Sequence, residues 1–166
     1  MSYSAAPSLA FRAVFEQSRA CGLVPIPIEV LPGEDGKLKV HVVFTNAAET
    51  LHALKCAASL CASLPAAITL LLPLTVPYPL PLEESPVALD FICRRISELV
   101  GAVGATSGFT AYVYLCRNPI ETVLKVLGAH ALVMIGLRHR WSLGKSRRMA
   151  RILRQNGHEV VLAFYG

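Results

Sequence analysis

The most chemically distinctive part of the sequence is a basic stretch near its carboxyl end, GLRHRWSLGKSRRMARILR (136–154). It contains seven arginines and lysines and no acidic residue. Guanidinium and ammonium groups bind phosphates and carboxylates through charge-assisted hydrogen bonds. The stretch therefore predicts a binding site for an anion.

The rest of the chain shows that this basicity is local. The 166 residues include 16 Lys and Arg against 11 Asp and Glu, a formal net charge of +5. Without the seven basic residues of the stretch, nine basic and 11 acidic residues remain, a balance of −2. A nearly neutral body with one basic patch predicts an anionic partner at one place. We do not expect nucleic acid to bind over the whole surface of the protein.

Composition predicts one folded domain with a packed core, because 54% of the residues are apolar and 16% are charged. The chain starts without the pattern of a secretory signal. Its most apolar segment, 68–82, is short and contains four prolines, so we expect no transmembrane segment. Five cysteines without a C-x-x-C spacing are typical of buried thiols in a reducing compartment. The expected location is cytoplasmic.

Short apolar runs alternate with segments of helical periodicity from residue 39 onward. Two later helices have start signals, Ser85-Pro86 and Asn118-Pro119. Apolar strands that alternate with helices predict an α/β fold in three layers, an open five-stranded parallel sheet with helices on both faces. The expected strands are 39–44, 68–72, 109–115, 131–136 and 159–164.

The first 38 residues do not follow this alternation. We expect an N-terminal extension over 1–38 and an α/β domain over 39–166. Residues 8–21 are expected to form a short helix. The segment IPIEVLPGEDGKLKV could form a hairpin with its turn at 32–36. That hairpin would add an edge strand or form an arm that reaches a partner protein.

Ligands of an open parallel sheet bind beyond the carboxyl ends of the strands, where the strand order reverses. The basic stretch follows the fourth strand and precedes a helix amino terminus, whose N–H groups and dipole attract anions. We therefore expect a phosphate-containing anion in this crevice, with two residues after the first strand on the opposite wall. The candidate binding residues are Thr45, Asn46, Gly136, Arg138, His139, Arg140, Gly144, Lys145 and Ser146.

Some of these residues, and some basic residues near them, could have a purely structural role. The arginines after Ser146 could form the solvated face of an amphipathic helix. Thr45 and Asn46 could serve only as a helix cap. Arg117 could reach the crevice or pair with Glu121, one turn further on.

Four runs of the sequence follow one another in a recognisable order, namely VVFTNAAETLHALKCAASLCA, ITLLLPLTVPYPLP, TAYVYLCRNPIETVLKVLGAHALVMIGLRHR and HEVVLAFY. Their order resembles the universal stress protein family over roughly residues 39–165. The most specific part is ALVMIG followed by a basic loop, similar to the family's strand that ends in methionine and glycine. The resemblance implies strand order 3-2-1-4-5, frequent homodimers and, in one branch, ATP or another adenine nucleotide between strands 1 and 4.

The sequence departs from the family's ATP-binding motif in three places. His139 stands where the motif has its second glycine. The final glycine-serine pair appears only as Gly144-Lys145-Ser146, about five residues early. Thr45 and Asn46 stand where ATP-binding members carry an acid. These departures argue against ATP binding through the usual contacts.

The resemblance implies a regulatory or sensory binding module of the stress response, with a nucleotide or other small phosphate anion as ligand. We do not expect an enzyme, because no Ser-His-Asp or Cys-His arrangement falls at the crevice. No metal is expected, since the histidines lack a metal-like spacing. One alternative is a degenerate member that acts through protein contacts, for example as part of a membrane transporter system. Another is a basic surface that binds RNA or an anionic membrane.

Overall fold

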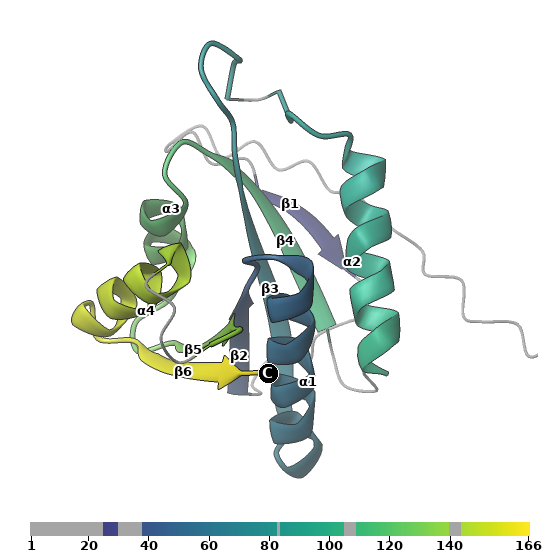
Figure 1. Cartoon of the computed structure of the whole chain (residues 1–166), viewed down its shortest axis with the longest axis vertical. Coiled ribbons are helices and arrows are strands. Elements are labelled where there is room, and N and C mark those ends of the chain that lie inside the picture. Colours follow the sequence, from purple (N-terminus) through teal and green to yellow (C-terminus); the bar gives the residue numbers. More distant parts are fainter. Residues whose placement is uncertain (1–24, 30–37, 83, 105–108, 140–143) are drawn as a thin grey trace, which may run out of the picture.

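A computed structural model describes residues 25–29, 38–82, 84–104, 109–139 and 144–166 (Figure 1). These residues form one six-stranded sheet and four helices. The strands are β1 (Pro25–Glu29), β2 (Leu38–Val43), β3 (Ala66–Thr75), β4 (Phe109–Cys116), β5 (Leu132–Leu137) and β6 (Glu159–Phe164). The helices are α1 (Ala47–Ser63), α2 (Leu89–Val103), α3 (Pro119–Val126) and α4 (Lys145–Gln155).

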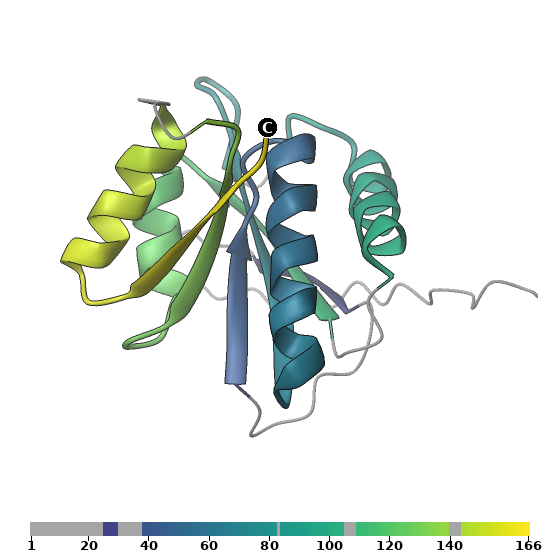
Figure 2. The same cartoon turned by 60° about the horizontal axis from the view of Figure 1, so that its bottom comes forward.

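The strand order across the sheet is β1-β4-β3-β2-β5-β6. Strands β2 to β6 are parallel, and among these five the order is the predicted 3-2-1-4-5. Helices α1 and α2 cover one face of the sheet, and α3 and α4 cover the other (Figure 2). The expected three-layer α/β fold is therefore confirmed.

Each face of the sheet has its own apolar cluster. Successive side chains of a strand point to opposite faces. Val42 of the central strand β2 therefore packs beneath α1 and α2, while its neighbour Val43 packs beneath α3 and α4. Burial on both faces explains why the strands appear in the sequence as unbroken apolar runs.

The predicted start signals have different outcomes at the two helices. Asn118 caps α3, because its side-chain oxygen accepts from the N–H groups of Ile120 and Glu121. Helix α2 begins at Leu89 and not at Ser85. The hydroxyl group of Ser85 instead donates to the carbonyl oxygen of Val87, which holds a local turn before the helix.

The predicted hairpin at the amino end is wrong, although the edge strand is confirmed. Strand β1 pairs antiparallel with β4, with Pro25 opposite Tyr114. Both edges of β2 are already paired, with β3 and with β5, so β2 has no free edge for a hairpin partner. The expected turn at 32–36 and the expected helix at 8–21 lie outside the described residues. The division of the chain at residue 38 remains a prediction.

His41 is a titratable residue in the middle of the central strand β2. Its Nδ1 atom is buried and has no hydrogen-bond partner among the described residues. Burial, together with the nearby Lys39 and His158, lowers the pKa of His41 from 6.5 to about 4. Protonation of His41 therefore opposes folding.

We predict that His41 makes the fold sensitive to acid. The pKa of His41 is lower in the folded state than in the unfolded state. Its contribution to the free energy of unfolding is therefore fully present above pH 6.5 and is lost as the pH falls through 4. At pH 4 the loss is roughly 3 kcal/mol of unfolding free energy. Urea unfolding at pH 7 and pH 4 should show this extra loss in the wild type and not in His41→Gln. The same pH dependence in both proteins would contradict the assignment.

Candidate functional site

A cavity of about 490 Å³ opens at the carboxyl edge of the sheet, between the first turns of α3 and α4. Its apolar surface includes Phe44, Pro73 and Met149. The polar lining comes from the segments that follow β2, from the end of β3, and from the first turns of both helices. These polar residues are Thr45, Thr75, Asn118, Lys145, Ser146 and Arg148.

The cavity lies where the strand order reverses. From β2 the chain proceeds through β3 to β4 on one side, and then continues through β5 to β6 on the other side. Helix α3 follows β4 and α4 follows β5, so their amino ends lie on either side of this reversal. Residues from the carboxyl ends of four different strands, or from the segments that follow them, thus meet around one cavity.

The amino terminus of α4 is the most electropositive part of the cavity wall. Its cap residue is Gly144, which has no side chain to accept a hydrogen bond. The N–H groups of Arg147 and Arg148 bond to the Gly144 carbonyl oxygen at 3.2 and 3.3 Å. Those of Lys145 and Ser146 have no acceptor among the described residues. Two N–H donors and a lysine side chain therefore lie at the cavity.

At the amino ends of the other described helices, side chains of the protein itself cap the N–H groups or balance the helix dipole. The side chain of Asn46 caps α1 and that of Asn118 caps α3. Acidic residues also lie in the first turns of α1, α2 and α3, namely Glu49, Asp90 and Glu121. Only α4, of these four, has neither a capping side chain nor a first-turn acid. Its dipole and its basic side chains therefore favour an anion from outside.

Thr45 and Asn46 lie at the end of β2, and hydrogen bonds tie both to the first turn of α1. The Thr45 N–H donates to Oγ1 of Thr50 at 3.1 Å, and the Thr45 hydroxyl donates to Oε2 of Glu49 at 2.9 Å. The Asn46 side chain accepts from the Glu49 N–H at 2.9 Å. The helix-cap interpretation is confirmed for Asn46, and of the two residues only Thr45 lines the cavity. These bonds also hold the Glu49 carboxylate beside the cavity.

Gly136 allows β5 to approach the first turn of α1 closely. A Cβ atom on this residue would lie 1.9 Å from the carbonyl oxygen of Glu49 and 2.5 Å from the carbonyl carbon. No side chain fits there without displacing backbone. The structure therefore gives Gly136 a packing role, and the residue does not line the cavity.

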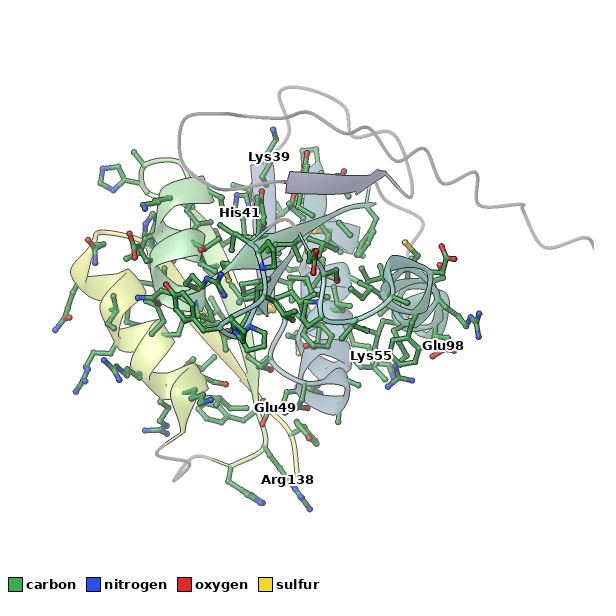
Figure 3. The ribbon with its side chains drawn as sticks, turned by 90° about the horizontal axis from the view of Figure 1, so that it is seen from above. Lys39, His41, Glu49, Lys55, Glu98 and Arg138 are labelled. Atoms are coloured by element: carbon green, nitrogen blue, oxygen red, sulfur yellow. The ribbon has the colours of Figure 1, made fainter. Side chains whose placement is uncertain are left out.

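Arg138 and His139 lie beyond the end of β5 and are exposed. Figure 3 shows Arg138 pointing outward, away from the sheet. The chain end lies beside them, because a Cβ on Gly166 would be 3.4 Å from the Arg138 carbonyl oxygen. Neither residue lines the cavity. Arg140 lies outside the described residues, so its predicted contact remains a prediction.

Two arginines lie outside the set of candidate binding residues. Arg148 is exposed, as on a solvated helix face, and it also lines the cavity, one turn after Lys145. Its i, i+3 spacing from Lys145 is the sequence signal that could have identified it. Arg117 neither reaches the cavity nor pairs with Glu121. Its guanidinium donates to the carbonyl oxygens of Val76 and Leu80, both at 2.6 Å, so it anchors the proline-rich loop.

The described residues include no group of three or more His, Cys, Asp or Glu that could hold a metal ion. In the same part of the chain, no helix has the length and apolar character to cross a membrane. Cys61 and Cys116 are buried and unpaired, and burial raises the pKa of both thiols. Cys21 lies outside the described residues.

A known structure shares this architecture. The chain superposes on the universal stress protein from Archaeoglobus fulgidus with a TM-score of 0.53 and 13% sequence identity. The match covers 75% of this chain and 92% of the other. The protein has a universal stress protein fold. No family model and no curated protein sequence matches the chain.

We predict that Gly136→Ala destabilises the protein by at least 2 kcal/mol, because the new methyl group overlaps the α1 backbone. Gly101→Ala is the matched control, since this glycine lies in α2 with nothing within 4 Å of an added Cβ. It should stabilise by about 0.5–1 kcal/mol through helix propensity. Urea unfolding measures both changes. A Gly136→Ala protein as stable as wild type would contradict the close approach.

Proposed function

We propose that this protein is a universal-stress-protein-like binding module that holds a small phosphate-containing anion in the cavity between α3 and α4. The observation that carries the proposal is the uncapped, basic amino terminus of α4, which opens on a cavity at the strand-order reversal. The fold shared with a universal stress protein supports the same location.

The α4 terminus is the anion-binding wall in this proposal. The N–H groups of Lys145 and Ser146 donate to phosphate oxygens, and the side chains of Lys145 and Arg148 supply the positive charge. Thr45 and Thr75 lie on the opposite side of the cavity. A volume of about 490 Å³ falls within the usual size of small-ligand sites, so a nucleotide such as ATP is a candidate ligand.

Arg138 and His139 contribute differently from the sequence expectation, because neither lines the cavity. In the proposal the Arg138 guanidinium adds to the positive potential at this edge of the sheet, and direct contact with the phosphate comes from α4. The departures from the family's ATP motif agree with this assignment, because the α4 contacts need neither a second glycine at 139 nor an acid after β2. The proposed module is regulatory and non-catalytic. A homodimer and a cytoplasmic location remain part of the proposal.

Calorimetric titration with ATP, ADP, AMP and pyrophosphate tests the site. We expect binding at micromolar to millimolar concentrations, weakened roughly ten- to 100-fold in the double variant Lys145→Gln/Arg148→Gln. Lys55→Gln, which removes an exposed charge from α1, is the control and should bind like wild type. If none of the four ligands gives heat or a melting shift at millimolar concentration, the degenerate, protein-binding alternative takes the place of this proposal.

The Glu49 carboxylate gives an independent test of where the anion lies. It accepts a hydrogen bond from Thr45, a residue of the cavity wall, so its negative charge opposes a bound phosphate. Glu49→Gln removes the charge and keeps an oxygen that can accept from Thr45. We expect pyrophosphate to bind roughly two- to fivefold more tightly to this variant at low salt. Unchanged or weaker binding would contradict the proposed location.

A further inference from the structure

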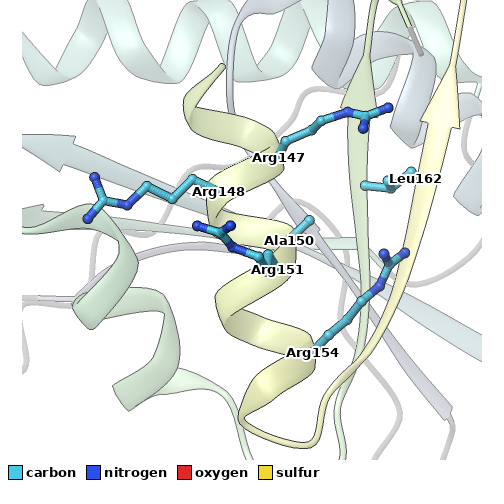
Figure 4. A pocket seen from close by; sticks show the side chains of 6 residues that line it. All are labelled: Arg147, Arg148, Ala150, Arg151, Arg154 and Leu162. Atoms are coloured by element: carbon cyan, nitrogen blue, oxygen red, sulfur yellow. The ribbon is translucent and has the colours of Figure 1, made fainter. Parts of the chain in front are cut away.

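A second hollow, which we call the arginine groove, lies beside the edge strand β6 on the outer side of α4 (Figure 4). Its volume is about 410 Å³. Arg147 and Arg154 extend from α4 toward β6, and Arg148 leaves the helix on the opposite side. The groove is lined by Arg147, Arg148, Ala150, Arg151, Arg154 and Leu162.

The positive charge of the groove is not neutralised within the described protein. Helix α4 contains no acidic residue, and its four arginines form no salt bridge with any described residue. Arg147 and Arg151 are four residues apart, and Arg151 and Arg154 are three apart, so like charges face one another. The Nε atom of Arg147 is buried without a hydrogen-bond partner in the described part of the chain. An external anion would relieve both the repulsion and the missing bond.

The structure argues against a membrane surface as this anion. A helix that binds in a bilayer surface exposes apolar side chains that enter the lipid. In α4 the apolar residues Met149, Ala150 and Leu153 are buried against the sheet. The remaining apolar residue of α4, Ile152, is half-buried, so the helix has no fully exposed apolar side chain to insert.

The structure also argues against an added peptide strand. Glu159 and Tyr165 of the β6 segment donate their N–H groups to the β5 segment, so the alternate residues turn their backbone outward. The outward carbonyl oxygen of Val160 already accepts a hydrogen bond of 2.8 Å from Nη2 of Arg154. This carbonyl oxygen is therefore not available to a partner strand. The groups that remain to bind a ligand here are the arginine side chains.

We propose that the arginine groove binds a linear chain of phosphates, as found in single-stranded RNA or inorganic polyphosphate. Arg147, Arg151 and Arg154 are spread over about 10 Å of the helix axis, so successive phosphates can each meet a guanidinium group. Phe164 lies two residues after Leu162 on the same side of β6 and is 37% exposed. Its ring can stack on a base, which only the RNA offers.

This inference goes beyond the small-anion cavity and does not depend on it. It develops the alternative that the sequence left open, a basic surface that binds RNA. The sequence shows that the arginines are close together along the chain. The structure shows that they surround one hollow, whose lining, among the residues that the structure describes, includes no acidic side chain to oppose a polyanion.

Fluorescence anisotropy with a labelled 12-nucleotide uridine RNA tests the proposal, with polyphosphate of similar length as competitor. In Arg147→Gln/Arg151→Gln we expect at least tenfold weaker binding. The slope of log K against log salt should fall by about 1.4, as for two lost phosphate contacts on a single strand. Arg94→Gln/Arg95→Gln removes two exposed arginines from α2 on the opposite sheet face and should change affinity less than twofold.

Several results would overturn the proposal. The groove variant could bind the RNA as tightly as wild type, or the α2 control could lose as much affinity as the groove variant. A poly-glutamate peptide or anionic vesicles could bind more tightly than both phosphate chains. If the double variant does not fold, the exposed single variant Arg151→Gln should still weaken binding severalfold. Weaker RNA binding by Phe164→Ala, with unchanged polyphosphate binding, would support RNA as the source of the phosphates.

Discussion

The distance between β4 and β5 is the constraint on which the candidate site depends. Strands β3 and β2 lie between them, so β4 and β5 are three strand spacings apart, or about 14 Å. Two packed helices are separated by only about 8–10 Å. Helices that start from β4 and β5 on the same face cannot close the space between their first turns. The cavity at the ends of α3 and α4 follows from this topology, whichever side chains line it.

The side chains then give that space its charge. At the start of α1, the Asn46 side chain accepts from an N–H group and the Glu49 carboxylate complements the helix dipole. Asn118 and Glu121 have the same two roles at the start of α3. The start of α4 has Gly144 and Arg147 at the corresponding positions, so its dipole remains uncompensated. The same helix carries the arginine groove on its outer side. Helix α4 thus contributes to both proposed anion sites, one at its amino end and one along its length.

The sequence predicted the parallel strands well, because each of them is a short apolar run and the segments between them have the apolar spacing of helices. It could not predict the partner of β1, since strand pairing depends on which edges the rest of the sheet leaves free. The site was predicted by location and less well by residue. Lys145 and Ser146 line the cavity, but Arg138 follows β5 outward and Gly136 serves close packing with Glu49. The spacing of residues along the chain does not show which way a side chain points or which backbone it packs against.

The central claim is that the α4 amino terminus binds phosphate through its backbone. Amide chemical shifts in a ¹H–¹⁵N spectrum, recorded while pyrophosphate is added, test it most directly. We expect the N–H signals of Lys145 and Ser146 to move the most and to saturate together, while those of Ile120 and Glu121 at the capped α3 terminus move little. Shifts at the α3 terminus with none at Lys145 and Ser146 would contradict it.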